Sequence, residues 1–102
     1  MRLRPFGNTG MNVSEIGLGT WQLDNPDWKM HDVPEALRIV EKSLDAGCNF
    51  FDTAPAYGMG RSEELLGKAL KTVRQDVIVC TKFSHYHADG SRDFDAANLR
   101  PE

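Results

Sequence analysis

The sequence predicts a mixed α/β fold with a parallel sheet, and its alternating segments carry this prediction. Short apolar runs that turn polar at their ends occur at 16–21, 49–52 and 77–82, as is typical of strands. Segments with apolar residues at helical spacing, 32–47 and 62–74, separate these runs. The last run shows no polar alternation, which favours a parallel strand covered on both faces.

A β-hairpin is predicted at the start of the chain. Residues 2–6 and 11–16 flank the turn-forming tetrad Gly-Asn-Thr-Gly at 7–10. The first strand run then contains Gly17 and Gly19. Glycine inside a strand indicates either a bulge or the close approach of another group, and the sequence leaves both alternatives open.

Both predicted helices carry signals at their ends. Asp32 and Glu35 are spaced as in a capping box. Gly47 suits the C-terminal end of the same helix. Ser62 is a favourable N-cap for the second helix. A further helix-like run at 95–100 lies close to the end of the sequence, after a polar stretch that we expect to be a loop.

Composition limits the classes of function. A chain of 102 residues is one domain at most. Its net charge of −3, with mixed signs, gives no indication of a nucleic-acid surface. No apolar run approaches the roughly 20 residues of a membrane helix, and no signal peptide is evident. Cys48 and Cys80 lie in or beside apolar runs, which favours buried free thiols in a reducing compartment. We expect a cytoplasmic protein that contacts neither nucleic acid nor membrane; the oligomeric state stays open.

Two neighbouring strand runs end on residues of opposite charge. Asp52 ends the second run and Lys82 ends the third. Parallel strands that follow one another through helices present their carboxyl ends at one edge of the sheet, where the chemistry of such folds is found. Tyr57 lies in the loop after Asp52. We therefore expect Asp52, Tyr57 and Lys82 to meet at this edge.

A cluster of Asp, Tyr and Lys can act as a general acid. A free tyrosine is a poor acid near neutral pH. A neighbouring ammonium favours the phenolate, so Lys82 would make Tyr57 a better proton donor, and Asp52 would hold Lys82 protonated. Such a phenol suits the reduction of a carbonyl group by a hydride donor. Each residue also has an ordinary interpretation: a turn cap, a packed ring and a solvated cation.

Three β/α units can begin several architectures. A flavodoxin-like sheet, half of a Rossmann fold and a (β/α)8 barrel all start this way. The glycines at 58 and 60 match a dinucleotide-binding motif only weakly, because Glu63 stands where a third glycine would be. A closed barrel takes about 250 residues. The chain is therefore part of a barrel or a small open sheet.

Five motifs, in order through the chain, resemble the N-terminal third of an aldo/keto reductase. They are Phe-Gly-Asn-Thr-Gly (6–10), Gly-Leu-Gly-Thr-Trp (17–21), Phe-Phe-Asp-Thr-Ala-Pro-Ala-Tyr-Gly (50–58), Arg-Ser-Glu-Glu-Leu-Leu-Gly-Lys-Ala-Leu (61–70) and Thr-Lys-Phe (81–83). The resemblance implies an α/β fold: an N-terminal hairpin over about residues 1–16, then the first three β/α units of a (β/α)8 TIM barrel. Residues 1–102 would be a partial, incomplete barrel domain.

The resemblance also implies a function. Members of this family use NADP(H) to reduce aldehydes and ketones to alcohols by hydride transfer, so it implies that cofactor and a small carbonyl substrate. It implies Tyr57 as the proton donor, with Lys82 and Asp52 as the pair that tunes it. Other positions correspond to residues that border the nicotinamide and its ribose: Gly19, Thr20, Trp21 and Asp52.

Some family features fall outside the matching residues. The family's catalytic histidine follows the fourth strand and would lie beyond Glu102, as would most cofactor contacts. His85 and His87 follow the third strand and do not replace it; they are also a weak metal motif, so no metal is expected. We expect the fragment alone to be inactive. Two other functions stay open: a cofactor-binding regulatory subunit of a membrane channel with the same fold, and a small open α/β binding module.

Overall fold

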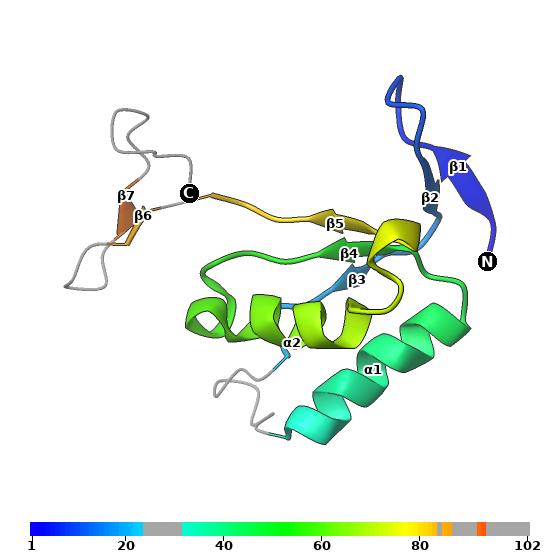
Figure 1. Cartoon of the computed structure of the whole chain (residues 1–102). Helices are drawn as coiled ribbons and strands as arrows, with labels where there is room; N and C mark the ends of the chain where they lie inside the picture. The colour runs from blue at the N-terminus through cyan, green and yellow to red at the C-terminus, as the bar shows by residue number, and fades with distance from the viewer. Residues whose placement is uncertain (24–31, 84, 87–91, 94–102) are drawn as a thin grey trace.

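The sheet at the centre of the molecule has three parallel strands in the order β3-β4-β5 (Figure 1). The computed structural model describes residues 1–23, 32–83, 85–86 and 92–93. The strands span Leu18–Gly19 (β3), Phe50–Asp52 (β4) and Ile78–Cys80 (β5). This confirms the predicted parallel α/β order. The helix-like run at 95–100 lies outside the described residues.

The predicted hairpin is confirmed. Strands β1 (Leu3–Pro5) and β2 (Asn12–Ser14) pair antiparallel. The hairpin is attached to the chain just before β4, because the Asn49 side chain accepts a hydrogen bond from the backbone of Ser14 at 2.7 Å. The same amide donates to the Asn12 carbonyl at 3.0 Å. In Figure 1 the hairpin therefore lies near the amino ends of the sheet strands.

Two helices cover the same side of the sheet (Figure 1). Helix α1 (Val33–Asp45) has Asp32 as its N-cap, whose carboxylate accepts a hydrogen bond from the Glu35 N–H, as predicted. Helix α2 (Arg61–Leu70) begins after Gly60, so the prediction of Ser62 as its N-cap is wrong. Ser62 is instead buried in the first turn. Within the described residues, no helix has the length and apolar character needed to cross a membrane.

The apolar core lies between the sheet and the two helices. Phe51, at the centre of β4, is fully buried, and the core is completed by a set of aliphatic residues and one thiol: Leu23, Ala36, Val40, Cys48, Leu65, Leu66, Leu70 and Val77. Both cysteines are free, as predicted. Only Cys48 is buried; Cys80 is exposed, because it ends β5, which pairs with β4 alone among the described strands.

The stretch after β5, predicted as a loop, contains a short antiparallel pair. Strand β6 (His85–Tyr86) pairs with β7 (Arg92–Asp93). Two residues per strand are too few for the period-two pattern by which a strand is found in a sequence. A short turn, η3 (Arg74–Asp76), precedes β5.

The two glycines of the first strand run serve different purposes. A Cβ atom on Gly17 would lie 2.7 Å from Cδ1 of Phe50 and 3.1 Å from its carbonyl oxygen. Gly17 is therefore required by the approach of Phe50, whose ring also packs against Phe6 at 5.7 Å between centroids. A Cβ on Gly19 would meet nothing within 4 Å in the part of the chain that the structure describes. The backbone at Gly19 is open.

We predict that Gly17→Ala destabilises the fold while Gly19→Ala does not. The added methyl at residue 17 must displace Phe50, and overpacking of this kind costs typically about 1–3 kcal/mol. The measurement is chemical denaturation of a complete (β/α)8 barrel that contains this chain as its N-terminal part, called the complete barrel from here on. It gives the free energy of unfolding of each variant. Equal values for Gly17→Ala and Gly19→Ala would contradict the packing argument.

Candidate active site

An ion pair joins the carboxyl ends of β4 and β5. Lys82 lies two residues after β5, and its Nζ donates to Oδ1 of Asp52 at 2.7 Å. The same ammonium donates to the Thr53 carbonyl at 3.0 Å. The side chains of Lys82 and Asp52 are 50% and 40% exposed. The pair is thus fixed by two adjacent strands and remains accessible from solvent.

Tyr57 reaches the same place from the loop after β4. It begins the short helical turn η2 (Tyr57–Gly60), and its N–H donates to the Ala54 carbonyl at 3.0 Å. The Lys82 ammonium lies 5.2 Å from the centre of the Tyr57 ring, within the range of a cation–π contact. The three residues expected at this edge are therefore together, while their catalytic role stays a prediction.

The charge of Lys82 is stabilised by its neighbours. The hydrogen bond that Lys82 donates to the Asp52 carboxylate raises the pKa of Lys82 above its usual range. Partial burial opposes this shift, and the phenol of Tyr57 and the charge of Asp52 add to it. Lys82 therefore carries its proton throughout the neutral pH range and presents a positive charge beside Tyr57.

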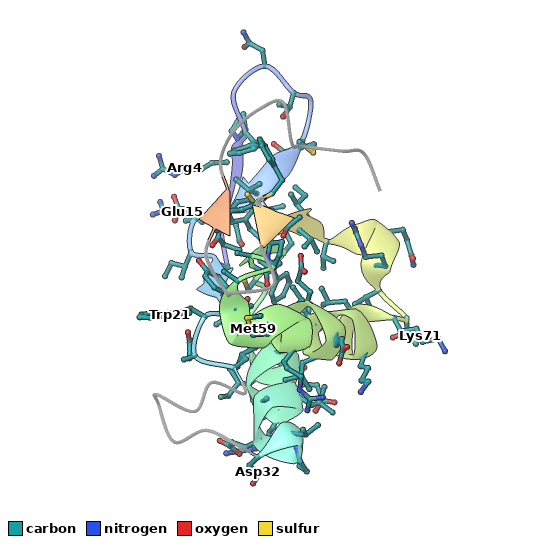
Figure 2. The ribbon with its side chains drawn as sticks, turned by 90° about the vertical axis from the view of Figure 1, so that its left-hand side faces the viewer. Arg4, Glu15, Trp21, Asp32, Met59 and Lys71 are labelled. Carbon is teal, nitrogen blue, oxygen red and sulfur yellow. The ribbon has the colours of Figure 1, made fainter. Side chains whose placement is uncertain are left out.

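The loop after Tyr57 turns through a left-handed stretch. Gly58, Met59 and Gly60 all have positive φ angles, of 59°, 55° and 90°. This conformation is ordinary for glycine and uncommon for methionine. This left-handed stretch changes the direction of the chain, and helix α2 begins directly after it. In Figure 2 the Met59 side chain lies at the front of the molecule, and it is 74% exposed.

The residues predicted to contact a cofactor lie in different environments. Gly19 is exposed and pairs in register with Asp52 on β4. Trp21 is half exposed and points away from the ribbon in Figure 2. Thr20 is fully buried, and its hydroxyl donates to the Asp52 carbonyl at 3.0 Å. In this structure the Thr20 side chain thus binds the backbone of Asp52. The cofactor-binding roles of Gly19, Thr20, Trp21 and Asp52 stay predictions.

Sequence reasoning missed the buried hydroxyl groups behind this edge. Ser62 and Thr53 are 0% and 1% exposed, and their oxygens are 3.3 Å apart. A signal for Ser62 was present in the sequence. It stands three and four residues before Leu65 and Leu66, and so shares their buried helix face. A polar residue on such a face needs hydrogen-bond partners from the rest of the fold.

A second contact ties α2 to the strand end that carries Lys82. The hydroxyl of Thr81 donates to Oε1 of Glu63 at 2.6 Å. Glu63 lies in the first turn of α2 and Thr81 directly precedes Lys82. The start of α2 is therefore hydrogen-bonded to Thr53, which follows β4, and to Thr81, which follows β5.

Comparison with known proteins identifies relatives of this chain. The family model described as the aldo/keto reductase family matches residues 15–100. The chain is 42% identical over 84 residues to aldo-keto reductase YhdN of Bacillus subtilis, covering 80% of this chain and 25% of that protein. The solved structure of aldo-keto reductase AKR11C1 from Bacillus halodurans, in its holo form, superimposes with a TM-score of 0.76 at 37% identity, covering 89% of this chain and 28% of that one.

A relative with a different name shares the same stretch. The chain is 38% identical over 85 residues to a protein of Oryza sativa subsp. japonica named probable voltage-gated potassium channel subunit beta. That match covers 80% of this chain and 25% of the relative. The chain thus spans about a quarter of the length of these curated relatives. It corresponds to the N-terminal hairpin and the first three β/α units of a (β/α)8 barrel.

We predict that Asp52→Asn lowers the pKa of Lys82. The substitution keeps the shape of the side chain but removes its charge and weakens the hydrogen bond that raises this pKa. A titration of the Lys82 Cε resonance by NMR in the complete barrel should give a lower midpoint in the variant. The stability that the pair contributes should be present below the ordinary lysine pKa and lost as pH rises through the raised one.

Asp45→Asn is the matched control for this titration. Asp45 forms an ion pair with Lys42 at 3.2 Å on the surface of α1, away from the site. It should leave the Lys82 midpoint where it is. An equal midpoint in wild type and Asp52→Asn would show that Asp52 does not hold the proton of Lys82.

Proposed function

We propose, because this chain belongs to the aldo/keto reductase family, that it is the N-terminal part of an NADPH-dependent reductase of aldehydes and ketones. The observation that carries the proposal is the contact among Asp52, Tyr57 and Lys82 at the carboxyl edge of the sheet. A proton donor and a cation beside it are what carbonyl reduction requires once a hydride donor is bound.

In the proposed reaction Asp52, Tyr57 and Lys82 each have a separate role. When bound, the cofactor would supply the hydride that the carbonyl carbon needs. Tyr57 gives its phenolic proton to the carbonyl oxygen, so the product is an alcohol. Lys82, protonated and 5.2 Å from the ring, stabilises the phenolate that remains. Asp52 keeps Lys82 charged and in place through the 2.7 Å hydrogen bond.

The open backbone at Gly19 supports a flat ligand at this edge. Among the described residues, no atom lies within 4 Å of the position that a Gly19 Cβ would occupy, and Asp52 is its neighbour across the strand pair. Trp21 follows with half of its surface exposed. Gly19, Trp21 and Asp52 would hold the nicotinamide end of the cofactor. A glycine in this place lets a planar ring approach the strand closely.

One observation favours a second function. The relative named as a channel subunit shares 38% identity with this chain. A regulatory subunit of the same fold could retain the cluster of Asp52, Tyr57 and Lys82 without high turnover. Turnover of a generic aldehyde by the complete barrel separates the two proposals. No observation on the described residues favours a small open binding module.

We predict that Tyr57→Phe greatly reduces turnover in the complete barrel. The substitution removes the transferable proton and keeps the ring, and general acid catalysis is worth about 10²–10⁴-fold. kcat for aldehyde reduction, followed by NADPH absorbance, should fall by that factor, and the Kd for NADPH should stay the same. Tyr86→Phe removes the other tyrosine hydroxyl of the chain and serves as the control. Near-normal turnover by Tyr57→Phe would assign the proton to another group.

We predict that Gly19→Ala weakens NADPH binding without a loss of stability. Its methyl would enter the open space at the strand end, where it meets no protein atom. The Kd for NADPH, measured by fluorescence titration, should rise at least tenfold, or about 1.4 kcal/mol. Gly67→Ala is the control, because a Cβ on this α2 residue also meets nothing within 4 Å. Unchanged NADPH affinity in Gly19→Ala would remove residue 19 from the cofactor site.

A further inference from the structure

We propose that Thr20 and Ser62 are positioning residues for Asp52, acting through a buried chain of hydroxyl groups. This inference rests on the proposed function and deepens it. It assigns to Thr20 the task of fixing the backbone that presents the Asp52 carboxylate to Lys82. Neither residue needs to touch the substrate or the cofactor.

The chain of hydroxyls consists of three fully buried side chains. Thr20 and Ser62 are 0% exposed and Thr53 is 1% exposed. The Ser62 oxygen lies 2.8 Å from the Thr20 hydroxyl and 3.3 Å from that of Thr53. The Thr20 hydroxyl lies 3.0 Å from the Asp52 carbonyl. Because buried polar groups without partners are costly, these oxygens are held to one another.

One direction of the protons satisfies every member of the chain. A hydroxyl group has a single proton to donate. Thr20 donates its proton to the Asp52 carbonyl, so its oxygen accepts from Ser62, and Ser62 in turn accepts from Thr53. The Ser62 hydroxyl also lies 2.9 Å from the Thr20 carbonyl, which is a second acceptor for the same proton and also accepts the Leu23 N–H at 3.1 Å. The chain of hydroxyl groups therefore ends at the Asp52 carbonyl.

Asp52 and Thr53 are thereby held from both sides of β4. Toward β3, the Asp52 carbonyl accepts two bonds from Thr20, from its N–H at 2.9 Å and from its hydroxyl. Toward β5, the Thr53 N–H donates to the Cys80 carbonyl at 2.8 Å, and the Thr53 carbonyl accepts from Lys82. A carbonyl oxygen has two lone pairs, and Thr20 engages both at Asp52. A shift of the Asp52 backbone would carry its carboxylate away from Lys82.

Ser62 extends this restraint to the loop that carries Tyr57. It lies in the first turn of α2, two residues after Gly60 ends the left-handed stretch. Its bonds to Thr20 and Thr53 thus fix the far end of the Tyr57 loop to β3 and β4. One buried group of oxygens sets the relative places of the proton donor and of the carboxylate.

The test compares Thr20→Val with Thr20→Ser in the complete barrel. Valine keeps the branched shape and removes the hydroxyl, whereas serine keeps the hydroxyl and removes a methyl group. In Thr20→Val the midpoint of the Lys82 Cε titration should fall. The value of kcat should drop by up to about 10²-fold, since small displacements of reacting groups have effects of that size. Thr20→Ser should recover most of both losses.

A merely structural role would give a different result. Both variants would then lower the melting temperature, while kcat and the Lys82 midpoint stayed at wild-type values. That outcome overturns the proposal. So does a rise in the Kd for NADPH in Thr20→Val at an unchanged Lys82 midpoint, because Thr20 would then be a cofactor contact. The Lys82 titration needs no turnover, so a wild-type protein without reductase activity would refute the proposed function and leave this test intact.

Ser62→Ala provides an independent second test. It leaves both Thr20 bonds to Asp52 possible but removes the donor that orients the Thr20 hydroxyl. The Lys82 midpoint and kcat should shift in the same direction as in Thr20→Val. Ser43→Ala is the control, because the Ser43 hydroxyl bonds to the Ile39 carbonyl within its own helix α1. If Thr20→Val and Ser62→Ala both fail to fold, the hydroxyls hold the fold and not the site, and the proposal is wrong.

Discussion

The parallel pairing of β4 with a strand on each side is the constraint on which the candidate site depends. It sets Gly19, Asp52 and Cys80 in one row across the sheet. Successive side chains of a strand point to opposite faces, so Phe51 enters the core while Asp52 faces away from it. A slip of one residue would bury the carboxylate and expose the phenyl ring. The burial of Phe51 therefore fixes where the charge of Asp52 stands.

The ion pair at this edge contributes little to stability. Lys82 and Asp52 are each about half exposed, and exposed pairs are worth about 0–1 kcal/mol. Burying a side chain such as that of Phe51 is worth several times more. The stability of the fold therefore does not depend on the ion pair, whereas the geometry of the ion pair depends on the fold. Its geometry, with one ammonium shared between the Asp52 carboxylate and the Thr53 carbonyl, places a positive charge 5.2 Å from the centre of the Tyr57 ring.

The sequence was sufficient for features that local patterns and the order of the elements determine. The strand at 49–52 and the meeting of its last residue with Lys82 follow from apolar runs and parallel order. Features that depend on how side chains of distant segments pack together were not accessible. Ser62 has the residue type of an N-cap, yet its partners are 42 residues away at Thr20. Cys80 has apolar neighbours in sequence, yet its burial depends on what covers a strand edge.

The first strand run shows how closely fold and site are joined. Gly17 and Gly19 are two residues apart, yet the first is closely packed and the second is open. At residue 17 the space is taken by Phe50, which connects the sheet to the hairpin through Phe6. At residue 19 the space is free, next to Asp52. Gly17 directly precedes β3 and Gly19 ends it, so a closely packed position and an open one stand at the two ends of this short segment. The segment is therefore packed at one end and leaves space at the other.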